Sequence, residues 1–535
     1  MAETGTTNTG ESSPPLPERL TFGVEFEFLT PTLPEDKPDP HEDVMGIGPV
    51  LRVPSSIYTA DEDDIYTNAY DRQEYVLECV RDILQHAFLT TAASSTFQGD
   101  KFTADILSGY SGWGVDEDPS LLEPRLQEYD WTNVEVQSPV EFSCEAAFKA
   151  ISYAASTITS KYRCRVNHST GLHVHVGQRE ERFPLEAIRR IGGLFWAAEP
   201  LLLTLQNPVR RTNVFCQSIR QRSHLAKGMP VLPPHSVENK GVEGIGVVEC
   251  IRYLARDRRH GEEPISRREK NTNVENIIEF KKTREPGHYE PFQVVVGSTP
   301  ANTLGLVSTQ SNLSEHIHHV ELNIVALSGI SGQAAAKTRR EVIRKRNIPV
   351  IKMPQYSTKQ YRVLHKTAEE YGVGGLSFKT GGIGGTAAKD IGVFDGVHQI
   401  FSAPSSCHIA ELLSPGKTTS LNLQSYGCYR FVTAAARRTI EFRFGEGVID
   451  PWAETMARIC VGLVRFALHA PVADYIDVLT SCDIAVKENG RYDVIDFLDD
   501  LCLFAEAEAA EKRIGKLKDE WGLEYVSSSR GSPSS

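Results

Sequence analysis

The sequence lacks paired cysteines, long hydrophobic runs and a secretory leader. Its ten cysteines lie singly along 535 residues, and no two have C-x-x-C spacing. This argues against a disulfide-rich scaffold and a zinc ribbon and favours reduced thiols. No run approaches the roughly 18 apolar residues that a membrane span needs, and residues 1–20 have neither the basic nor the apolar segment of a secretory signal. We therefore expect a cytoplasmic protein with no membrane partner.

An excess of positive charge is also missing. Lysine and arginine number 57 against 70 aspartates and glutamates, which gives a formal net charge of −13. We therefore expect no nucleic-acid partner. Hydrophobic residues make up 40% of the chain and charged residues 24%, as is ordinary for a globular protein. A chain of 535 residues can bury one large core or form two to three domains of ordinary size.

What the sequence does have is three short stretches in which charged and apolar residues alternate. They read TFGVEFEF at 21–28, GLHVHVG at 171–177 and TIEFRFG at 439–445. With the two-residue period of a strand, each places its apolar side chains on one face and its charged side chains on the other. The charged positions are Glu25, Glu27, His173, His175, Glu441 and Arg443. If the three strands share one sheet, these side chains form a pocket that suits hard divalent cations and phosphates.

Composition divides the chain into two halves of one catalytic domain around an insertion. We expect disordered ends at 1–19 and 527–535, because both are polar and rich in Ser, Pro and Gly. Residues 20–224 and 401–526 carry the periodic segments and form the N-terminal and C-terminal halves. Residues 225–400 have weak periodicity, basic runs and a glycine-rich part, so we interpret them as a long, partly irregular insertion.

Capping signals and periodicity predict further elements. Asp71–Glu74 resembles a capping box that begins a helix, and Ser138-Pro139 with Glu141 predicts the start of another that runs to about residue 160. The remaining predicted elements are a strand at 131–139, an apolar helix at 184–206 that kinks or breaks before Pro200, and helices at about 451–469 and 493–516.

Each charged motif also has an ordinary structural explanation. An E-x-E strand is usually a solvated sheet face, although carboxylates roughly 7 Å apart along a strand can converge on neighbouring cations. Two histidines can be a chance surface pair, but the glycines that bracket them predict close backbone approach or tight turns. The pair itself suits a metal or a phosphate. Glu441 and Arg443 form either a cross-strand salt bridge or a cation ligand beside a phosphate-binding fork. Glu135, near the end of its strand, is a further candidate carboxylate.

In this order, the three stretches resemble the amidoligase family, a branch of the carboxylate–amine ligases akin to glutamine synthetase and glutamate–cysteine ligase. Trp113–Asp116 and the V-E-V-Q-S-P segment ending at Pro139 resemble the family's tryptophan/aspartate segment and its E-x-x-S-P turn. The resemblance covers about 20–220 and 400–470. It implies an α+β fold in which a mostly antiparallel, curved, glutamine synthetase-like sheet is flanked by helices. ATP would enter one end of the resulting funnel, and the substrates would meet at the other.

The resemblance also implies roles for individual residues. Those that would bind Mg²⁺ or Mn²⁺ are Glu25, Glu27, Glu135, His173 and Glu441. Those that would contact the phosphates of ATP are His175 and Arg443. The substrate carboxylate would be held either by Asp116 or by the pair Arg210 and Arg211. The catalytic residues would then be Glu25, Glu27, Glu441 and Arg443. Magnesium suits carboxylates and phosphates, and Mn²⁺ tolerates imidazole better.

The activity that this resemblance implies is that of an ATP-dependent carboxylate–amine ligase, which forms an amide through an acyl-phosphate intermediate. Its partners would be small-molecule or peptide carboxylates and amines. Two other classes stay open. A divalent-metal-dependent hydrolase would use His173 and His175 with further histidines such as His398 or His408. A catalytically silent binding protein would keep the fold and use the insertion as its interaction surface.

Overall fold

The computed structural model describes the greater part of the chain in several separate ranges. The described residues are 20–58, 65–87, 89, 112–124, 128–178, 181–228, 346–354, 358–370, 390–414, 416–427, 439–488 and 490–526. The two ends for which we predict disorder, and most of the predicted insertion, lie outside these residues.

A mostly antiparallel sheet forms the centre of the described structure. Its strand order is β3-β4-β1-β6-β8-β7, and β2 and β5 pair with β1 at its two ends. The pairing of β1 with β2 is parallel and the other strand pairings are antiparallel. The strands are β1 Thr21–Pro34, β2 Leu51–Val53, β3 Gly114–Asp116, β4 Asp130–Gln137, β5 Glu141–Phe142, β6 Gly171–Gly177, β7 Leu421–Asn422 and β8 Ile440–Glu446. Together with the helices, this antiparallel sheet confirms the predicted α+β class.

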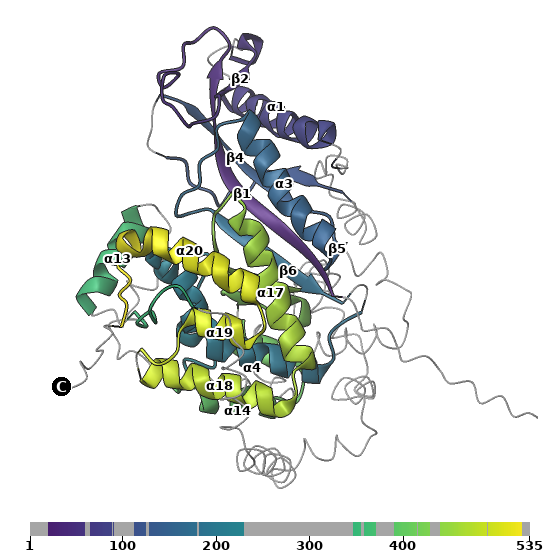
Figure 1. Ribbon diagram of the computed structural model, residues 1–535. Coiled ribbons are helices and arrows are strands. Elements are labelled where there is room, and N and C mark those ends of the chain that lie inside the picture. The colour runs from purple at the N-terminus through teal and green to yellow at the C-terminus, as the bar shows by residue number, and fades with distance from the viewer. Residues whose placement is uncertain are drawn as a thin grey trace, which may run out of the picture.

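Some helices pack against one face of the sheet, and others form a further layer below it in the view of Figure 1. The α-helices are α1 Ile65–His86, α3 Glu145–Lys161, α4 Leu185–Leu202, α5 Ile219–Arg222, α13 Thr358–Glu370, α14 Val393–Ser402, α15 Ser406–Leu413, α17 Trp452–His469, α18 Val472–Lys487, α19 Val494–Asp500 and α20 Phe504–Trp521. Short 3-10 helices are η1 Ser55–Tyr58, η4 Leu203–Leu205, η5 Pro208–Thr212 and η8 Gln424–Tyr426. In the described part of the chain, no helix combines the length and the apolarity of a membrane span.

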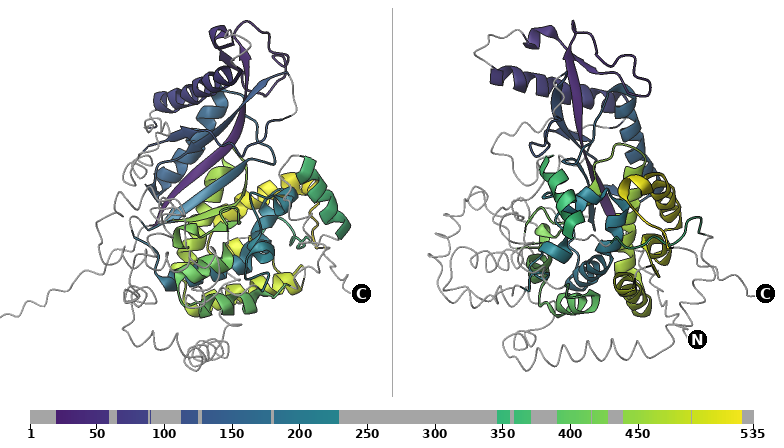
Figure 2. Two further views of the ribbon diagram at one scale, coloured as in Figure 1. Left: turned by 180° about the vertical axis from the view of Figure 1, so that it is seen from behind. Right: turned by 90° about the vertical axis from the view of Figure 1, so that its left-hand side faces the viewer.

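The apolar face of the sheet carries the core, as the alternation predicts. Phe22, Val24, Phe26 and Phe28 of β1 are all buried, and the ring of Phe22 stacks on Phe148 of α3 with 4.5 Å between centroids. Views from opposite sides place α1 and α3 together on this face (Figures 1 and 2). Each such side chain contributes roughly 1.5–3 kcal/mol by its burial. With its apolar face covered in this way, the sheet presents its charged face on the opposite side.

Two predicted helix starts are wrong, and long-range contacts explain the second. Helix α1 already begins at Ile65, so the Asp71–Glu74 capping box lies inside it, where Glu74 pairs with Arg81 at 3.3 Å. At the second position, Ser138 Oγ accepts a hydrogen bond from the backbone N–H of Val24 at 2.9 Å. The chain then forms β5 against the start of β1, and α3 begins only at Glu145. Sheet pairing outweighs the local capping signal at this site.

Of the other predicted elements, some are confirmed by the structure and others differ from it. Strand β4 and helix α17 confirm the predictions for 131–139 and 451–469. Of the predicted kink or break before Pro200, the break is excluded, because α4 continues to Leu202. Proline has no N–H for the carbonyl of Trp196 four residues earlier, and Arg220 Nη1 donates to that carbonyl instead at 3.1 Å. The single helix predicted at 493–516 is two helices, α19 and α20, separated at Cys502 by a backbone φ of 60°.

Candidate functional site

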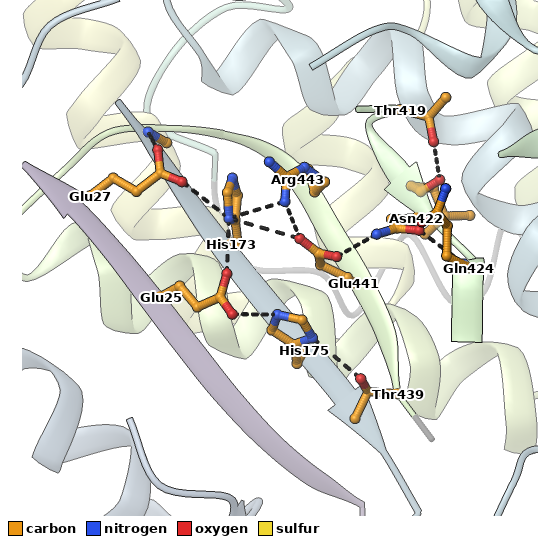
Figure 3. A network of polar contacts seen from close by, with 12 residues as sticks. Glu25, Glu27, His173, His175, Thr419, Asn422, Gln424, Thr439, Glu441 and Arg443 are labelled. Carbon is orange, nitrogen blue, oxygen red and sulfur yellow. Dashed lines mark hydrogen bonds and ion pairs between the residues drawn. The ribbon is translucent and has the colours of Figure 1, made fainter. Parts of the chain in front are cut away.

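Strand register brings the charged positions of five segments onto one face of the sheet. Glu25 lies opposite Gln137 of β4 on one side and His173 of β6 on the other. One row further along, His175 of β6 pairs with Glu441 of β8, which pairs with Asn422 of β7. Figure 3 shows the side chains of Glu25, His173, His175, Glu441 and Asn422 close together above the strands. The residues predicted to form one pocket from three distant stretches of sequence are therefore neighbours.

A first group of cation-ligand atoms is made by Glu25, His173 and Glu441, whose ligand atoms lie within 4.8 Å of one another. His173 Nδ1 is 3.1 Å from Glu25 Oε2 and 3.8 Å from Glu441 Oε1. All three side chains are buried. Asn422 Nδ2 donates to Glu441 Oε2 at 2.5 Å, which fixes that carboxylate from its other side.

A second group is made by Glu27, Asp118 and Glu135, again with ligand atoms within 4.8 Å of one another. Glu27 and Glu135 are directly opposite each other on β1 and β4, and Gln137 Nε2 donates to Glu135 Oε1. Asp118 follows β3 in a turn where its Oδ1 accepts the N–H of Ser120 at 2.7 Å. Asp118 is not among the predicted site residues. Its only sequence indication of a role here is its position two residues after Asp116.

The two carboxylates of the first group are held ionised. Burial opposes the ionisation of Glu25, but the charge of His175 and hydrogen bonds from His173 and His175 outweigh burial and hold the pKa of Glu25 well below its usual range. Burial likewise opposes the ionisation of Glu441, and the nearby guanidinium of Arg443 outweighs it, so the pKa of Glu441 is lowered. Opposite charges close by favour the charged form of an acid.

The second group shows the opposite behaviour. Burial raises the pKa of Glu27. Burial, followed by the charges of Glu25 and Glu27, raises the pKa of Glu135 well above its usual range. Carboxylates that share a site repel each other and hold a proton more tightly. When its three carboxyl groups are ionised, the second group therefore carries more negative charge than the surrounding protein compensates. A bound divalent cation would offset this charge.

Arg443 and His175 complete the cluster from β8 and β6. Arg443 Nη1 donates to Glu441 Oε1 and lies 3.4 Å from His173 Nδ1. Its Nε is buried and has no hydrogen-bond partner among the described residues. His175 places Nε2 at 3.1 Å from Glu25 Oε1 and Nδ1 at 3.2 Å from Thr439 Oγ1. The Nε–H of Arg443 thus has no partner among the described residues, whereas both ring nitrogens of His175 already face protein oxygens.

Gly171 confirms the prediction of close backbone approach at the start of the histidine strand. Its N–H donates to Glu27 Oε2 at 2.6 Å. A Cβ at this position would come within 2.7 Å of Arg210 Nη2 and 2.9 Å of His173 Nε2. Only a residue without a side chain allows both groups to approach so closely.

The three residues predicted to hold a substrate carboxylate lie in different surroundings. Asp116 is half-buried on β3, directly opposite Glu135. Arg210 is 3% exposed, and its two Nη atoms donate to the backbone carbonyls of Thr170 and Arg443 at 3.3 and 3.0 Å. Arg211 is half-buried and donates to the carbonyl of Pro200 at 3.4 Å. Of these three, Asp116 is the residue that the strand register places on the charged face of the sheet.

Comparison with known proteins supports the family assignment for part of the chain. No curated protein and no solved structure matches the sequence. One family model, described as "Putative amidoligase enzyme", matches residues 18–227, and this range contains Glu25, Glu27, Asp118, Glu135 and His173. Residues 18–227 are thus similar to the amidoligase family, the ligase-type enzyme family that the sequence motifs resemble.

Proposed function

We propose that this protein is an ATP-dependent carboxylate–amine ligase with a glutamine synthetase-like catalytic sheet. The observation that carries the proposal is the convergence of two cation-ligand groups and Arg443 on one face of the sheet. One of the groups lies wholly in the segment that matches the amidoligase family. The other is completed by Glu441 from β8, far beyond that segment.

The donor atoms fit Mg²⁺ or Mn²⁺. Five carboxyl groups, from Glu25, Glu27, Asp118, Glu135 and Glu441, share the two groups with one imidazole. Hard oxygen ligands are what Mg²⁺ prefers, and Mn²⁺ also accepts imidazole nitrogen. The raised pKa of Glu135 supports this fit, because a buried acid among other acids needs compensating positive charge. Cations held by these residues would offset the negative charge of the phosphates of ATP.

The residues of the chain would orient the nucleotide. Arg443 offers its unpartnered Nε–H toward a phosphate oxygen while Nη1 stays on Glu441, and a guanidinium suits planar phosphate recognition. His175 would reach a phosphate oxygen only by exchanging its contact with Glu25 or Thr439. Arg443 is therefore the stronger of the two candidates for the phosphate contact.

The proposed reaction has two steps. An oxygen of the substrate carboxylate attacks the γ-phosphorus, the bond to the bridging oxygen breaks, and ADP leaves with that electron pair. The amine nitrogen then attacks the acyl carbon of the acyl phosphate. Phosphate leaves with the carbon–oxygen electron pair and takes up the proton that the amine loses. Arg443 would stabilise the charge that develops on the transferred phosphoryl group.

The hydrolase alternative has less support in this geometry. Within the described residues, the two cation-ligand groups contain a single histidine, His173. His398 and His408, the further histidines that a hydrolase would need, lie in α14 and α15 and belong to neither group. Carboxylate-rich ligand sets are typical of cations that bind phosphates.

The decisive experiment measures ADP release against a panel of carboxylate–amine pairs. We expect release that requires both a carboxylate and an amine, and we expect Glu25→Gln and Arg443→Ala each to abolish it. Glu186→Gln, an exposed acid on α4, is the matched control and should leave the rate unchanged. Amine-independent turnover, or undiminished turnover in either site variant, would defeat the proposal. A protein that hydrolyses a substrate without ATP would establish the hydrolase instead.

A further inference from the structure

Strand β8 carries an irregularity at the point where it presents Arg443. Leu172 of β6 pairs with Gly445, whereas Val174 pairs with Phe442. Between these pairs, β6 has one residue, His173, and β8 has two, Arg443 and Phe444. Such a bulge bends a strand and re-aims a side chain, and its extra residue is left outside the ladder.

The backbone groups of Arg443 are satisfied from outside the β6–β8 ladder. Its N–H donates to the carbonyl of Ser420, just before β7, at 2.8 Å. Its carbonyl accepts Nη2 of Arg210 at 3.0 Å. The other end of the same guanidinium, Nη1, donates to the carbonyl of Thr170 at 3.3 Å. One side chain therefore ties the bulge of β8 to the residue that precedes β6.

The surroundings of Arg210 suit this structural task better than the capture of a substrate. Its side chain comes from η5 and is 3% exposed. The guanidinium lies against Gly171 so closely that a Cβ there would come within 2.7 Å of Nη2. Both Nη atoms already donate to backbone carbonyls, so a substrate carboxylate could bind the Nη edge only by displacing those bonds. The remaining donor, Nε–H, is buried and has no hydrogen-bond partner among the described residues.

We infer that Arg210 is a positioning residue, which holds the β8 bulge so that Arg443 stays aimed at Glu441 and His173. The inference rests on the proposed function only for the role of Arg443 toward a phosphate. Its structural part, that Arg210 sets the local stability of β8 at Arg443, is independent of any reaction. It replaces the substrate-binding role that the family resemblance implies for Arg210.

The first test is residue-resolved hydrogen exchange of the full-length protein without ligands. In Arg210→Gln, we expect the amides of Arg443 and Phe444 to exchange about tenfold faster or more, with a smaller increase in Arg210→Lys. The amides of Phe26 and Phe28 in β1 should keep their rates. Arg211→Gln is the matched control for exchange, because it removes the neighbouring guanidinium and leaves the bulge contact intact. Should Arg210→Gln fail to fold, Arg210→Lys alone decides. Unchanged exchange at Arg443 in the folded variant would overturn the inference.

The second test is a double-mutant cycle on kcat/KM for amine-dependent ADP release. If Arg210 acts through Arg443, adding Arg210→Gln to Arg443→Gln should cost less than about twofold beyond Arg443→Gln alone, although Arg210→Gln by itself costs about tenfold or more. Multiplying effects would show independent roles and overturn the inference. Absence of any ligase activity in the wild type would refute the proposed function, while the exchange experiment would still decide the role of Arg210.

Discussion

His173 and Glu25 lie directly opposite each other on β6 and β1, with His173 Nδ1 3.1 Å from Glu25 Oε2. The same nitrogen is 3.4 Å from Glu27 Oε1, so His173 stands between the first and second cation-ligand groups. A cation in the first group would bind His173 through Nδ1, the nitrogen that faces these carboxylates, and a metal-bound imidazole nitrogen carries no proton.

We predict that His173→Asn removes cation binding at the first group and leaves the second. The wild type should bind two Mn²⁺ ions per chain, and the variant one, as counted by electron paramagnetic resonance of free Mn²⁺ during a titration. His86→Asn, an exposed position on α1 where ring Nδ1 lies 2.7 Å from the carbonyl oxygen of Asp82, is the control and should keep both sites. A variant that still binds two ions with wild-type affinity would contradict this assignment.

Asp118→Asn should weaken the second group selectively. Loss of a ligand should lower the affinity of that site for Mn²⁺ at least about tenfold, since even changes to residues that only support ligands cost that much. Asp116→Asn is the natural comparison, because Asp116 lies two residues away and belongs to neither group of ligands. An equal loss of Mn²⁺ affinity in the two variants would show that removal of negative charge near the site causes the loss. Asp118 would then not be a specific ligand.

Gly171→Ala should destabilise the protein, because the new methyl group meets Arg210 and His173 below 3.0 Å. Overpacking of this kind costs about 1–3 kcal/mol in the free energy of unfolding. Gly515→Ala provides a control of opposite sign. Gly515 lies in α20 with nothing within 4 Å of its added Cβ, so alanine there should stabilise by about 0.5–1 kcal/mol. Urea denaturation measures both, and a neutral Gly171→Ala would show that the contacts are looser than described.

The stability of the protein should depend on pH through Asp39. Burial opposes the ionisation of Asp39, but hydrogen bonds from Arg163 and Tyr129, each 2.7 Å long, outweigh it and lower its pKa from 3.8 to about 2. A carboxyl with a depressed folded-state pKa adds stability above its unfolded pKa, and this stability is lost as the pH falls from about 3.8 to about 2.

Asp39→Asn should accordingly lower the free energy of unfolding at pH 7 by about 1–3 kcal/mol, the usual contribution of a hydrogen bond to a charged group. The difference from wild type should shrink below pH 3.8 in urea titrations. Asp36→Asn, whose exposed carboxylate accepts one hydrogen bond from Ser55, should change stability by less than about 0.5 kcal/mol at either pH. A difference between Asp39→Asn and wild type that is constant with pH would exclude the carboxylate as its source.

The faces of β1, β6 and β8 could be predicted from sequence because the alternation of side chains is a local property of a strand. That Glu25, His173 and Glu441 meet requires their strands to share one sheet, which the family resemblance implied and the residues alone did not. Asp118 could not be predicted, since its loop is placed by distant contacts. Leu122 N–H donates to Ser169 Oγ, and Asn167 Nδ2 donates to the carbonyl of Leu122. The late start of α3 was missed for the same reason, because Ser138 and β5 are held by β1.

The pairing of β6 with β8 bears on how many residues the chain can have between these two strands. Residues 178–439 separate these neighbouring strands, and the first group needs ligands from both. The entropic cost of closing a loop grows only with the logarithm of its length, by roughly 0.6 kcal/mol per doubling. Large changes in the number of residues between the two strands can therefore accumulate during evolution without disturbing the partnership of His175 and Glu441.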